Sequence, residues 1–137
     1  MSQRLLERRF SASPAELKAT RHAVQGALAT CGISESDARD VVMALDEACQ
    51  NVIRHAYGAE RSGDIELAIE REGDALVIWL TDWAPRIDPT RVRPRNLDDV
   101  RPGGLGTHLI REVMDAADFV EPPPGCGNLL KMVKRID

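Results

Sequence analysis

The amino-acid sequence predicts an α+β protein, a two-layer sandwich in which helices cover one face of a β-sheet. Two helical patterns lie next to each other in the first half of the chain, at residues 13–31 and 34–57. Strand patterns follow at residues 64–70 and 75–80, and another ends the chain at residues 129–136. The order strand, two helices, two strands, loop, helix and two strands favours a single sheet with its helices on one side. We expect this sheet to be mixed.

The composition fits one domain spanning residues 1–137. The chain is 43% hydrophobic, enough to bury a core, and only 4% aromatic, so aliphatic side chains must fill that core. The net charge of −4 argues against direct binding to nucleic acid. The longest strongly apolar run, Ala75–Leu80, is too short to cross a membrane, and Met1–Leu5 lacks the apolar region of a signal peptide.

The cysteines fit a cytoplasmic location. Cys31, Cys49 and Cys126 are far apart, have no CxxC spacing and are odd in number, which is typical of reduced thiols. Cys49 falls on the apolar side of its helix, and this favours a packing role over a chemical one.

Short-range signals mark the first strand and the two helices that follow it. A strand at residues 4–10 is expected at an edge of the sheet. Ser13 can cap the first helix, with Glu16 completing a capping box. Gly32 ends this helix, and the second helix is expected at about residues 34–57.

A β-hairpin is expected after the second helix. Ile65, Leu67 and Ile69 alternate with polar residues, which is typical of a half-buried strand. A turn at Glu72–Asp74 leads to Ala75–Leu80, and this nearly continuous apolar run predicts a central strand.

A long irregular segment follows the central strand, at about residues 83–106. It is rich in proline and contains five arginines: Arg86, Arg91, Arg93, Arg95 and Arg101. A long irregular insert in a compact domain is usually a lid or a disordered loop. A helix at about residues 107–115 and strands at 118–121 and 129–136 complete the expected fold.

The second helix carries four kinds of polar side chain on one face. Glu47, Asn51 and His55 have the spacing i, i+4 and i+8, and Arg54 lies on the same side. A carboxylate can polarise a hydroxyl or a water molecule, and a carboxamide oxygen can bind a hard cation such as Mg²⁺. The ordinary solvated face of an amphipathic helix has the same pattern, so both interpretations stay open on this pattern alone.

Asp82 directly follows the central strand. A carboxylate at a strand end can accept a hydrogen bond from an exocyclic amine, and the small residue Ala84 would let a flat ring approach the backbone. An aspartate in an ordinary turn would give the same sequence.

A glycine-rich segment, Gly103–Thr107, opens the third helix. Free backbone N–H groups at a helix start can bind an anion, and Thr107 adds a hydroxyl. The segment is not a P-loop, because no Gly-Lys-Ser/Thr follows, and it is not a Rossmann fingerprint, because Leu109 occupies the place of the last glycine. The alternative interpretation is that these glycines only form a flexible turn in the loop.

In this order and at these distances, the three motifs resemble the GHKL ATPase superfamily over nearly the whole chain. The N box corresponds to Glu47–Tyr57, the G1 box to Asp82–Pro85 and the G2 box to Gly103–Ile110. More closely, the chain is similar to the anti-sigma factor serine/threonine kinases of bacterial stress and sporulation switches, in which the continuation Arg86–Pro89 is typical.

That resemblance implies the Bergerat ATP-binding fold, with residues 83–106 as the ATP lid. Glu47 would be the general base, Asn51 would coordinate the Mg²⁺ that bridges the phosphates, and Asp82 would bind the adenine amine. The phosphates would be wrapped by Gly104, Leu105, Gly106 and Thr107. Arg54, His55 and Ala84 would belong to the nucleotide site as members of their boxes.

The resemblance also implies partners. The γ-phosphate of ATP would pass to a serine or threonine of an anti-anti-sigma factor with a STAS domain, and the kinase would sequester a sigma factor once that partner is phosphorylated. A homodimer is implied in the same way, without direct contact to nucleic acid or membrane.

The alternative is a non-catalytic anti-sigma or scaffold module that binds nucleotide weakly or not at all. Ala84 stands where the G1 box usually has glycine, and no threonine follows Thr107 to contact adenine from a late strand. Intact Glu47 and Asn51 argue against this alternative. The ATPase half of a two-component histidine kinase is disfavoured, because no dimerisation helix with a phospho-acceptor histidine precedes the domain.

Overall fold

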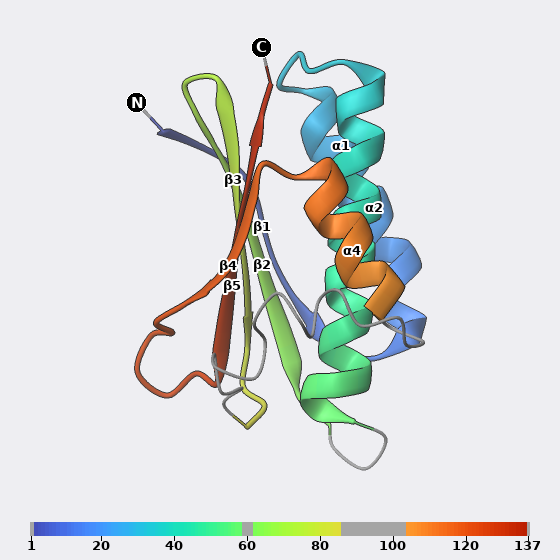
Figure 1. Ribbon diagram of the computed structural model, residues 1–137, viewed down its shortest axis with the longest axis vertical. Helices are drawn as coiled ribbons and strands as arrows, with labels where there is room; N and C mark the ends of the chain where they lie inside the picture. Colours follow the sequence, from blue (N-terminus) through green and yellow to red (C-terminus); the bar gives the residue numbers. More distant parts are fainter. Residues whose placement is uncertain (1, 59–61, 86–103, 137) are drawn as a thin grey trace.

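The computed structural model describes residues 2–58, 62–85 and 104–136, and only the backbone of residues 104–107. The strands are β1 (Ser2–Ser11), β2 (Asp64–Glu72), β3 (Ala75–Asp82), β4 (Ala116–Val120) and β5 (Asn128–Arg135), and the α-helices are α1 (Leu17–Ala29), α2 (Glu35–Asn51) and α4 (Gly104–Val113). The α-helices lie on the same side of the sheet (Figure 1). The predicted α+β class and two-layer sandwich are confirmed.

The sheet has the strand order β1-β2-β3-β5-β4, and every pairing between the described strands is antiparallel. The expectation of a mixed sheet is therefore wrong. The helical hairpin α1–α2 returns the chain to the end at which β1 finished, so β2 runs back along β1. Strands β3 and β4 do run in the same direction, as a crossover through one helix requires, but β5 lies between them and pairs with both.

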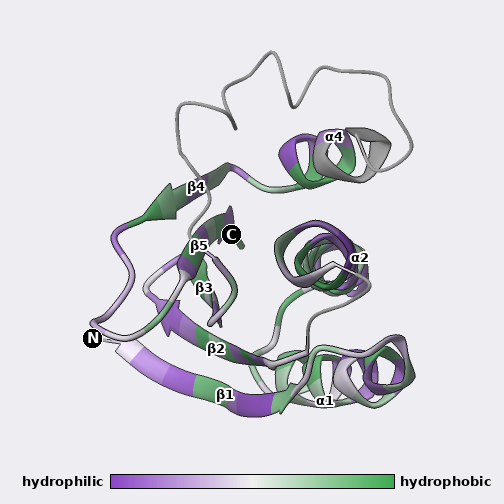
Figure 2. Ribbon diagram, turned by 90° about the horizontal axis from the view of Figure 1, so that it is seen from below, coloured by the Kyte–Doolittle hydropathy of each residue, from purple (hydrophilic) through white to green (hydrophobic). Residues whose placement is uncertain are grey.

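The core fills the space between the sheet and α2, which occupies the middle of the helical layer, between α1 and α4 (Figure 2). Alternate residues of β2 and β3 face the helices and are at most 1% exposed: Ile65, Leu67, Ile69, Leu76, Ile78 and Leu80. These strands carry the predicted patterns, and β3 is the central strand as expected. Full burial of each such side chain contributes about 1.5–3 kcal/mol, so the α2–sheet interface fixes the position of the polar face of α2.

The start of the first helix differs from the predicted capping box. Ser13 Oγ accepts a hydrogen bond from the Ala15 N–H at 3.3 Å, as a cap should. The Ser13 N–H donates to the carbonyl oxygen of Ser11 at 2.8 Å, so it is already satisfied by the turn that leaves β1. The Glu16 carboxylate lies 4.0 Å from the Arg8 guanidinium instead.

The second helix changes its winding at its C-terminal end. It is α-helical from Glu35 to Asn51 and continues as a π-helical turn over Val52–Tyr57. The Gly58 N–H donates to the Ile53 carbonyl at 3.1 Å, and Gly58 has a φ of 76° that ends the helix. The extent of the helix matches the sequence prediction, but its last turn is wider, a feature that is frequent at functional sites.

Lys134 on β5 holds the C-terminal end of α4. Its Nζ donates to the Val113 carbonyl at 2.7 Å and lies 3.9 Å and 3.8 Å from the carboxylates of Asp37 and Asp40 on α2. A cation at a helix C-terminus is favourable for the helix dipole. One buried lysine therefore ties α4 to both the sheet and α2.

None of the described helices is long and apolar enough to cross a membrane. The expected lid, at about residues 83–106, lies mostly outside the described residues, which resume at Gly104. The assignment of residues 1–137 to one domain stays a prediction.

Candidate nucleotide-binding and catalytic site

Three segments that carry the sequence motifs meet at one end of the molecule. The C-terminal part of the second helix and the end of β3 lie at the lower end of the view in Figure 1, and α4 starts on the same side but nearer the middle. Because β3 and α2 are packed through the core, the polar groups that follow these apolar stretches come to the same edge of the sandwich.

The polar face of α2 brings a carboxylate and a guanidinium together. The Glu47 side chain is 18% exposed, and its Oε1 lies 3.5 Å from Nη2 of Arg54. The same Nη2 donates to Gln50 Oε1 at 3.1 Å. His55 is exposed to solvent. The Glu47 carboxylate is therefore partly accessible to solvent and lies next to a positive charge.

Asn51 has a buried oxygen to which none of the described residues donates a hydrogen bond. Its Oδ1 is inaccessible to solvent and has no hydrogen-bond partner among the described residues. Leaving a buried acceptor unsatisfied costs about 1–3 kcal/mol. A cation, or a donor carried by a ligand, would remove this cost, so the oxygen fits the predicted Mg²⁺ ligand.

The surroundings of Asn51 suit a metal ion that arrives with a substrate. No group of three or more His, Cys, Asp or Glu side chains within the described ranges could hold a metal ion. Mg²⁺ commonly keeps several waters and takes one or two protein ligands together with substrate phosphates. A single carboxamide is compatible with that mode and not with a metal enclosed by protein.

Asp82 is a buried carboxylate with fixed donors. It is 2% exposed, and its Oδ1 accepts hydrogen bonds from the Ala84 N–H and from Asn128 Nδ2, both at 3.0 Å. Burial raises the pKa of Asp82, while these hydrogen bonds act in the opposite direction. The bond to Ala84 is one that a turn aspartate also makes, but the depth of burial goes beyond an ordinary surface turn.

Asn128 is a site residue that the sequence interpretation missed. It is 4% exposed and pairs with Asp82 in the β3–β5 register. Its Nδ2 donates to Asp82 Oδ1 and also to the Pro85 carbonyl at 3.1 Å. A polar residue that opens the last strand was the available signal, but only the strand register shows which residue it faces.

Gly127 lies against the backbone of Ala84. Its N–H donates to the Asp82 carbonyl at 2.8 Å, and a Cβ at this position would lie 1.8 Å from the Ala84 carbonyl oxygen. Ala84 itself is 3% exposed, and no non-glycine residue of the described chain has a positive φ. The backbone at Ala84 therefore does not require glycine, which removes one reason to doubt this G1 box. Whether its methyl crowds a ring stays a prediction.

Tyr57 connects the end of α2 to the end of β3, a role that the sequence did not indicate. Its hydroxyl accepts a hydrogen bond from the Trp83 N–H at 2.9 Å and donates to the Asp64 carbonyl at 2.7 Å. Burial raises the pKa of Tyr57, so it remains a neutral donor. At Gly63, a Cβ would lie 2.5 Å from the Tyr57 ring, so the glycine is needed for this contact. Tyr57 thus fixes the N box relative to the G1 box.

Helix α4 begins at Gly104, earlier than the expected start at about Thr107. Residues Gly104–Thr107 of the motif therefore lie in the first described turn of α4, and the backbone N–H groups of a helix's first turn have no intrahelical acceptor. Such a turn can bind an anion. The structure does not describe the side chains of residues 104–107, so the expected contacts of these residues with phosphate stay predictions.

Cys49 has the packing role that the sequence predicted. It is 1% exposed, and burial raises the pKa of its thiol to about 12. A thiol that stays protonated at neutral pH is a poor nucleophile.

The fold and the positions of these residues define a GHKL-type ATPase domain. Residues 10–134 match the family described as the histidine kinase-like ATPase domain, and the chain belongs to this family.

Two relatives narrow the assignment. The serine-protein kinase RsbW of Staphylococcus epidermidis is 27% identical over 98% of this chain and 90% of its own length. The serine-protein kinase RsbW of Halalkalibacterium halodurans is 30% identical over 83% of this chain and 72% of its own length. The predicted assignment to the protein serine/threonine kinases of the superfamily is confirmed.

Two solved structures share the fold. The RsbU and RsbW domains of a Mycobacterium tuberculosis protein superpose with a TM-score of 0.66 at 18% identity, over 96% of this chain and 31% of that one. This chain therefore spans about a third of that longer chain. The SiaB–SiaC complex from Pseudomonas aeruginosa gives a TM-score of 0.65 at 21% identity, over 95% of this chain and 89% of that one.

Proposed function

We propose that this protein is an ATP-dependent serine-protein kinase and anti-sigma factor. It phosphorylates an anti-anti-sigma partner with a STAS domain and sequesters a sigma factor. The observation that carries the proposal is the buried Oδ1 of Asn51, which has no hydrogen-bond partner among the described residues and lies one helical turn after the partly accessible carboxylate of Glu47. The similarity to RsbW serine-protein kinases supports the same activity.

Nucleotide binding would use both ends of the site. The Asp82 carboxylate accepts a hydrogen bond from the adenine amine, and Ala84 and Asn128 hold that carboxylate in place. The first turn of α4, with Gly104, Leu105, Gly106 and Thr107, holds the phosphates, and Arg54 and His55 border them. Asn51 Oδ1 would hold Mg²⁺, which neutralises charge on the phosphates when it is bound.

Phosphoryl transfer itself would depend on Glu47. This carboxylate takes the proton of the partner's serine hydroxyl as the serine oxygen forms a bond to the γ-phosphorus. The bond from that phosphorus to the oxygen bridging the β- and γ-phosphates breaks, and ADP leaves. Positioning and charge neutralisation supply most of the catalysis in such reactions, and a positioned base contributes about 10²–10⁴ in rate.

The proposal includes a homodimer in the cytoplasm without direct contact to nucleic acid. Free thiols at Cys31, Cys49 and Cys126 and the acidic net charge of −4 support the last two points. The homodimer rests on the family resemblance.

A non-catalytic binding module is the outcome that would replace this proposal. The main reason to consider such a module is Ala84 in the G1 box. The backbone at Ala84 has no positive φ and does not need glycine, which weakens this reason.

The test is incubation with γ-labelled ATP, Mg²⁺ and a purified STAS-domain protein from the same organism. We expect label on a serine or threonine of the STAS protein. Asn51→Ala should abolish transfer, whereas Gln25→Ala, at an exposed position on α1, should transfer at the wild-type rate. Absence of label on every STAS protein of the organism, together with tight sigma binding, would establish the binding module.

Thermal unfolding separates nucleotide binding from transfer. Mg²⁺ and ATP at about 100 times Kd should add about 2.7 kcal/mol to the free energy of unfolding. Asn51→Ala should lose most of this gain, while the unliganded variant should be at least as stable as the unliganded wild type, because the unsatisfied acceptor is gone. An equal gain in wild type and Asn51→Ala would contradict the role of Asn51.

A further inference from the structure

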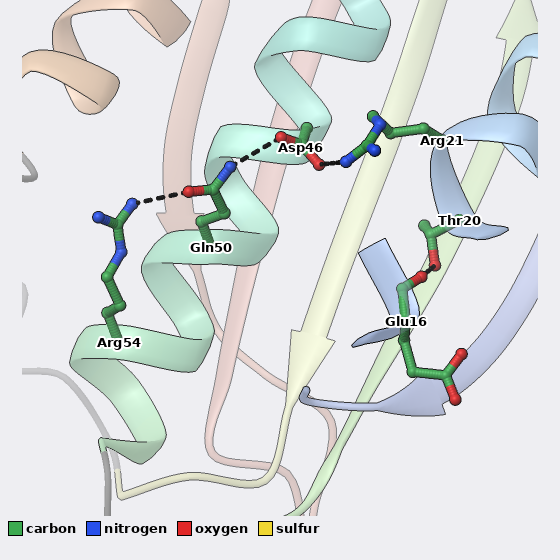
Figure 3. Close-up of polar contacts among 6 residues, drawn as sticks. All are labelled: Glu16, Thr20, Arg21, Asp46, Gln50 and Arg54. Atoms are coloured by element: carbon green, nitrogen blue, oxygen red, sulfur yellow. Dashed lines mark hydrogen bonds and ion pairs between the residues drawn. The ribbon is translucent and has the colours of Figure 1, made fainter. Parts of the chain in front are cut away.

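A chain of polar contacts runs from Arg21 on α1 along the second helix to Arg54 (Figure 3), and Arg54 in turn contacts Glu47. Arg21 Nη1 donates to Asp46 Oδ1 at 3.0 Å, and Gln50 Nε2 donates to Asp46 Oδ2 at 2.8 Å. Gln50 Oε1 accepts from Arg54 Nη2 at 3.1 Å, and that nitrogen lies 3.5 Å from Glu47 Oε1. Five side chains thus form one connected series from a neighbouring helix to the base.

The neighbours of Gln50 determine which way its amide points. A carboxylate such as Asp46 can only accept hydrogen bonds, and a guanidinium such as Arg54 can only donate them. The amide NH₂ must therefore face Asp46 and the amide oxygen must face Arg54, as observed. A flipped amide would break both contacts, so the series has a single orientation.

The series does little for stability. The Arg54 side chain is 47% exposed and that of Arg21 is 40% exposed. Exposed contacts of this kind contribute about 0.2–0.5 kcal/mol each. What the series does favour is one direction of the Arg54 side chain, toward Glu47, among the rotamers that this side chain can sample.

We propose that Gln50 is a positioning residue for Glu47, an inference that rests on the proposed role of Glu47 as the base. Gln50 holds the Arg54 guanidinium beside Glu47 Oε1, and the guanidinium holds the carboxylate in one rotamer. Arg54 belongs to the π-helical turn and Glu47 to the α-helical part, so the contact also joins these two parts of the helix. Displacing a reacting group by about 1 Å can cost up to about 10²-fold in rate.

The experiment is Gln50→Met, which keeps the length and helix propensity of the side chain and removes both hydrogen bonds. We expect kcat for transfer to the STAS protein, and for basal ATP hydrolysis, to fall about 10-fold. KM for ATP should change less than kcat does, because Gln50 is not among the residues assigned to the nucleotide and reaches the phosphates only through Arg54. Gln25→Met, the same change at an exposed position on α1, should have no effect.

A double-mutant cycle shows whether Gln50 acts through Glu47. In a Glu47→Gln background, Gln50→Met should cause no further loss of kcat, because the group it positions is already gone. A further 10-fold loss in that background, or wild-type kcat for Gln50→Met alone, would overturn the inference. If Gln50→Met proves unstable in thermal melts, Gln50→Ala decides, since it also removes the acceptor for Arg54 and should cause the same loss of kcat.

These outcomes differ from failure of the proposed function. Absent transfer and absent hydrolysis by the wild type would reject the kinase, and wild-type transfer by Glu47→Gln would reject the base. A large loss for Glu47→Gln with none for Gln50→Met rejects only the positioning role.

Discussion

The two ends of the candidate site are built in opposite ways. Around Asp82 the contacts are buried and several involve the backbone: Asp82 and Asn128 are 2% and 4% exposed, and their partners include the Ala84 N–H and the Pro85 carbonyl. Around Glu47 the contacts join one side chain to another, and the Arg54 side chain is 47% exposed.

With the proposed roles of Asp82 and Glu47, this difference means that recognition and chemistry have different structural requirements. A group that recognises a nucleobase must be rigid and shielded from water, so its hydrogen bonds are made to the strands that hold it. A group that takes a proton must stay accessible to a second protein, so it is aligned by side chains at the surface. Changes at the buried end should therefore affect stability and affinity, and changes at the exposed end should affect rate.

The largest expected effect is at the exposed end. Glu47→Gln keeps the shape of the side chain and removes its basic charge, so transfer to the STAS protein should fall about 10²–10⁴-fold. ATP affinity should stay within a few-fold, and thermal stability should be unchanged. Single-turnover transfer and nucleotide titrations measure both. A matching loss of ATP affinity would show that the two ends are not separable.

The next effect is at the buried end. Gly127→Ala would bring a Cβ within 1.8 Å of the Ala84 carbonyl oxygen, which is backbone and cannot yield without moving the end of β3. Overpacking of this kind costs about 1–3 kcal/mol, and we expect the upper part of this range. Urea denaturation measures it. Gly26→Ala on α1 is the control, because nothing lies within 4 Å of the added methyl, and it should stabilise by about 0.5–1 kcal/mol.

Asp82→Asn should separate binding from stability within the buried end. A hydrogen bond to a charged group contributes about 1.5–3 kcal/mol, so its loss should weaken ATP binding by about 10- to 100-fold. The folded protein should not be destabilised at neutral pH, because burial disfavours the charge that the change removes.

The pH dependence of stability tests this explanation. Because the folded pKa of Asp82 is raised above the unfolded value of about 3.9, its proton stabilises the fold below that value, and this contribution is lost as pH rises through the folded pKa. In thermal melts from acid to neutral pH, the stability of Asp82→Asn relative to the wild type should therefore increase as pH rises. A variant that instead falls behind at neutral pH would mean that the ionised carboxylate stabilises the fold.

The smallest expected effect is that of Ala84→Gly. Its backbone does not need glycine, so the change should destabilise by about 0.5–1 kcal/mol through added freedom of the unfolded chain. Nucleotide titration then decides the remaining question. Tighter ATP binding would show that the methyl crowds adenine, and equal or weaker binding would show that alanine suits this G1 box.

The sequence by itself determined the class of fold and the order of the elements, and it predicted the segments that carry the candidate site. Local patterns suffice for this, because the alternation in β2, the apolar run of β3 and the stripe of α2 each reflect burial within one element. The N-box residues Glu47 and Asn51 could be found because they lie one turn apart on a single helix.

Only the tertiary structure decided how these elements pair and which groups meet. The insertion of β5 between β3 and β4 made the sheet antiparallel, and no local pattern records it. The same strand register placed Asn128 beside Asp82, which is 46 residues earlier in the chain. The end of the π-helical turn placed the Tyr57 hydroxyl where it accepts a hydrogen bond from the Trp83 N–H. Contacts between residues so distant in sequence depend on the packing of the whole core, which is why their partners could not be read from the chain.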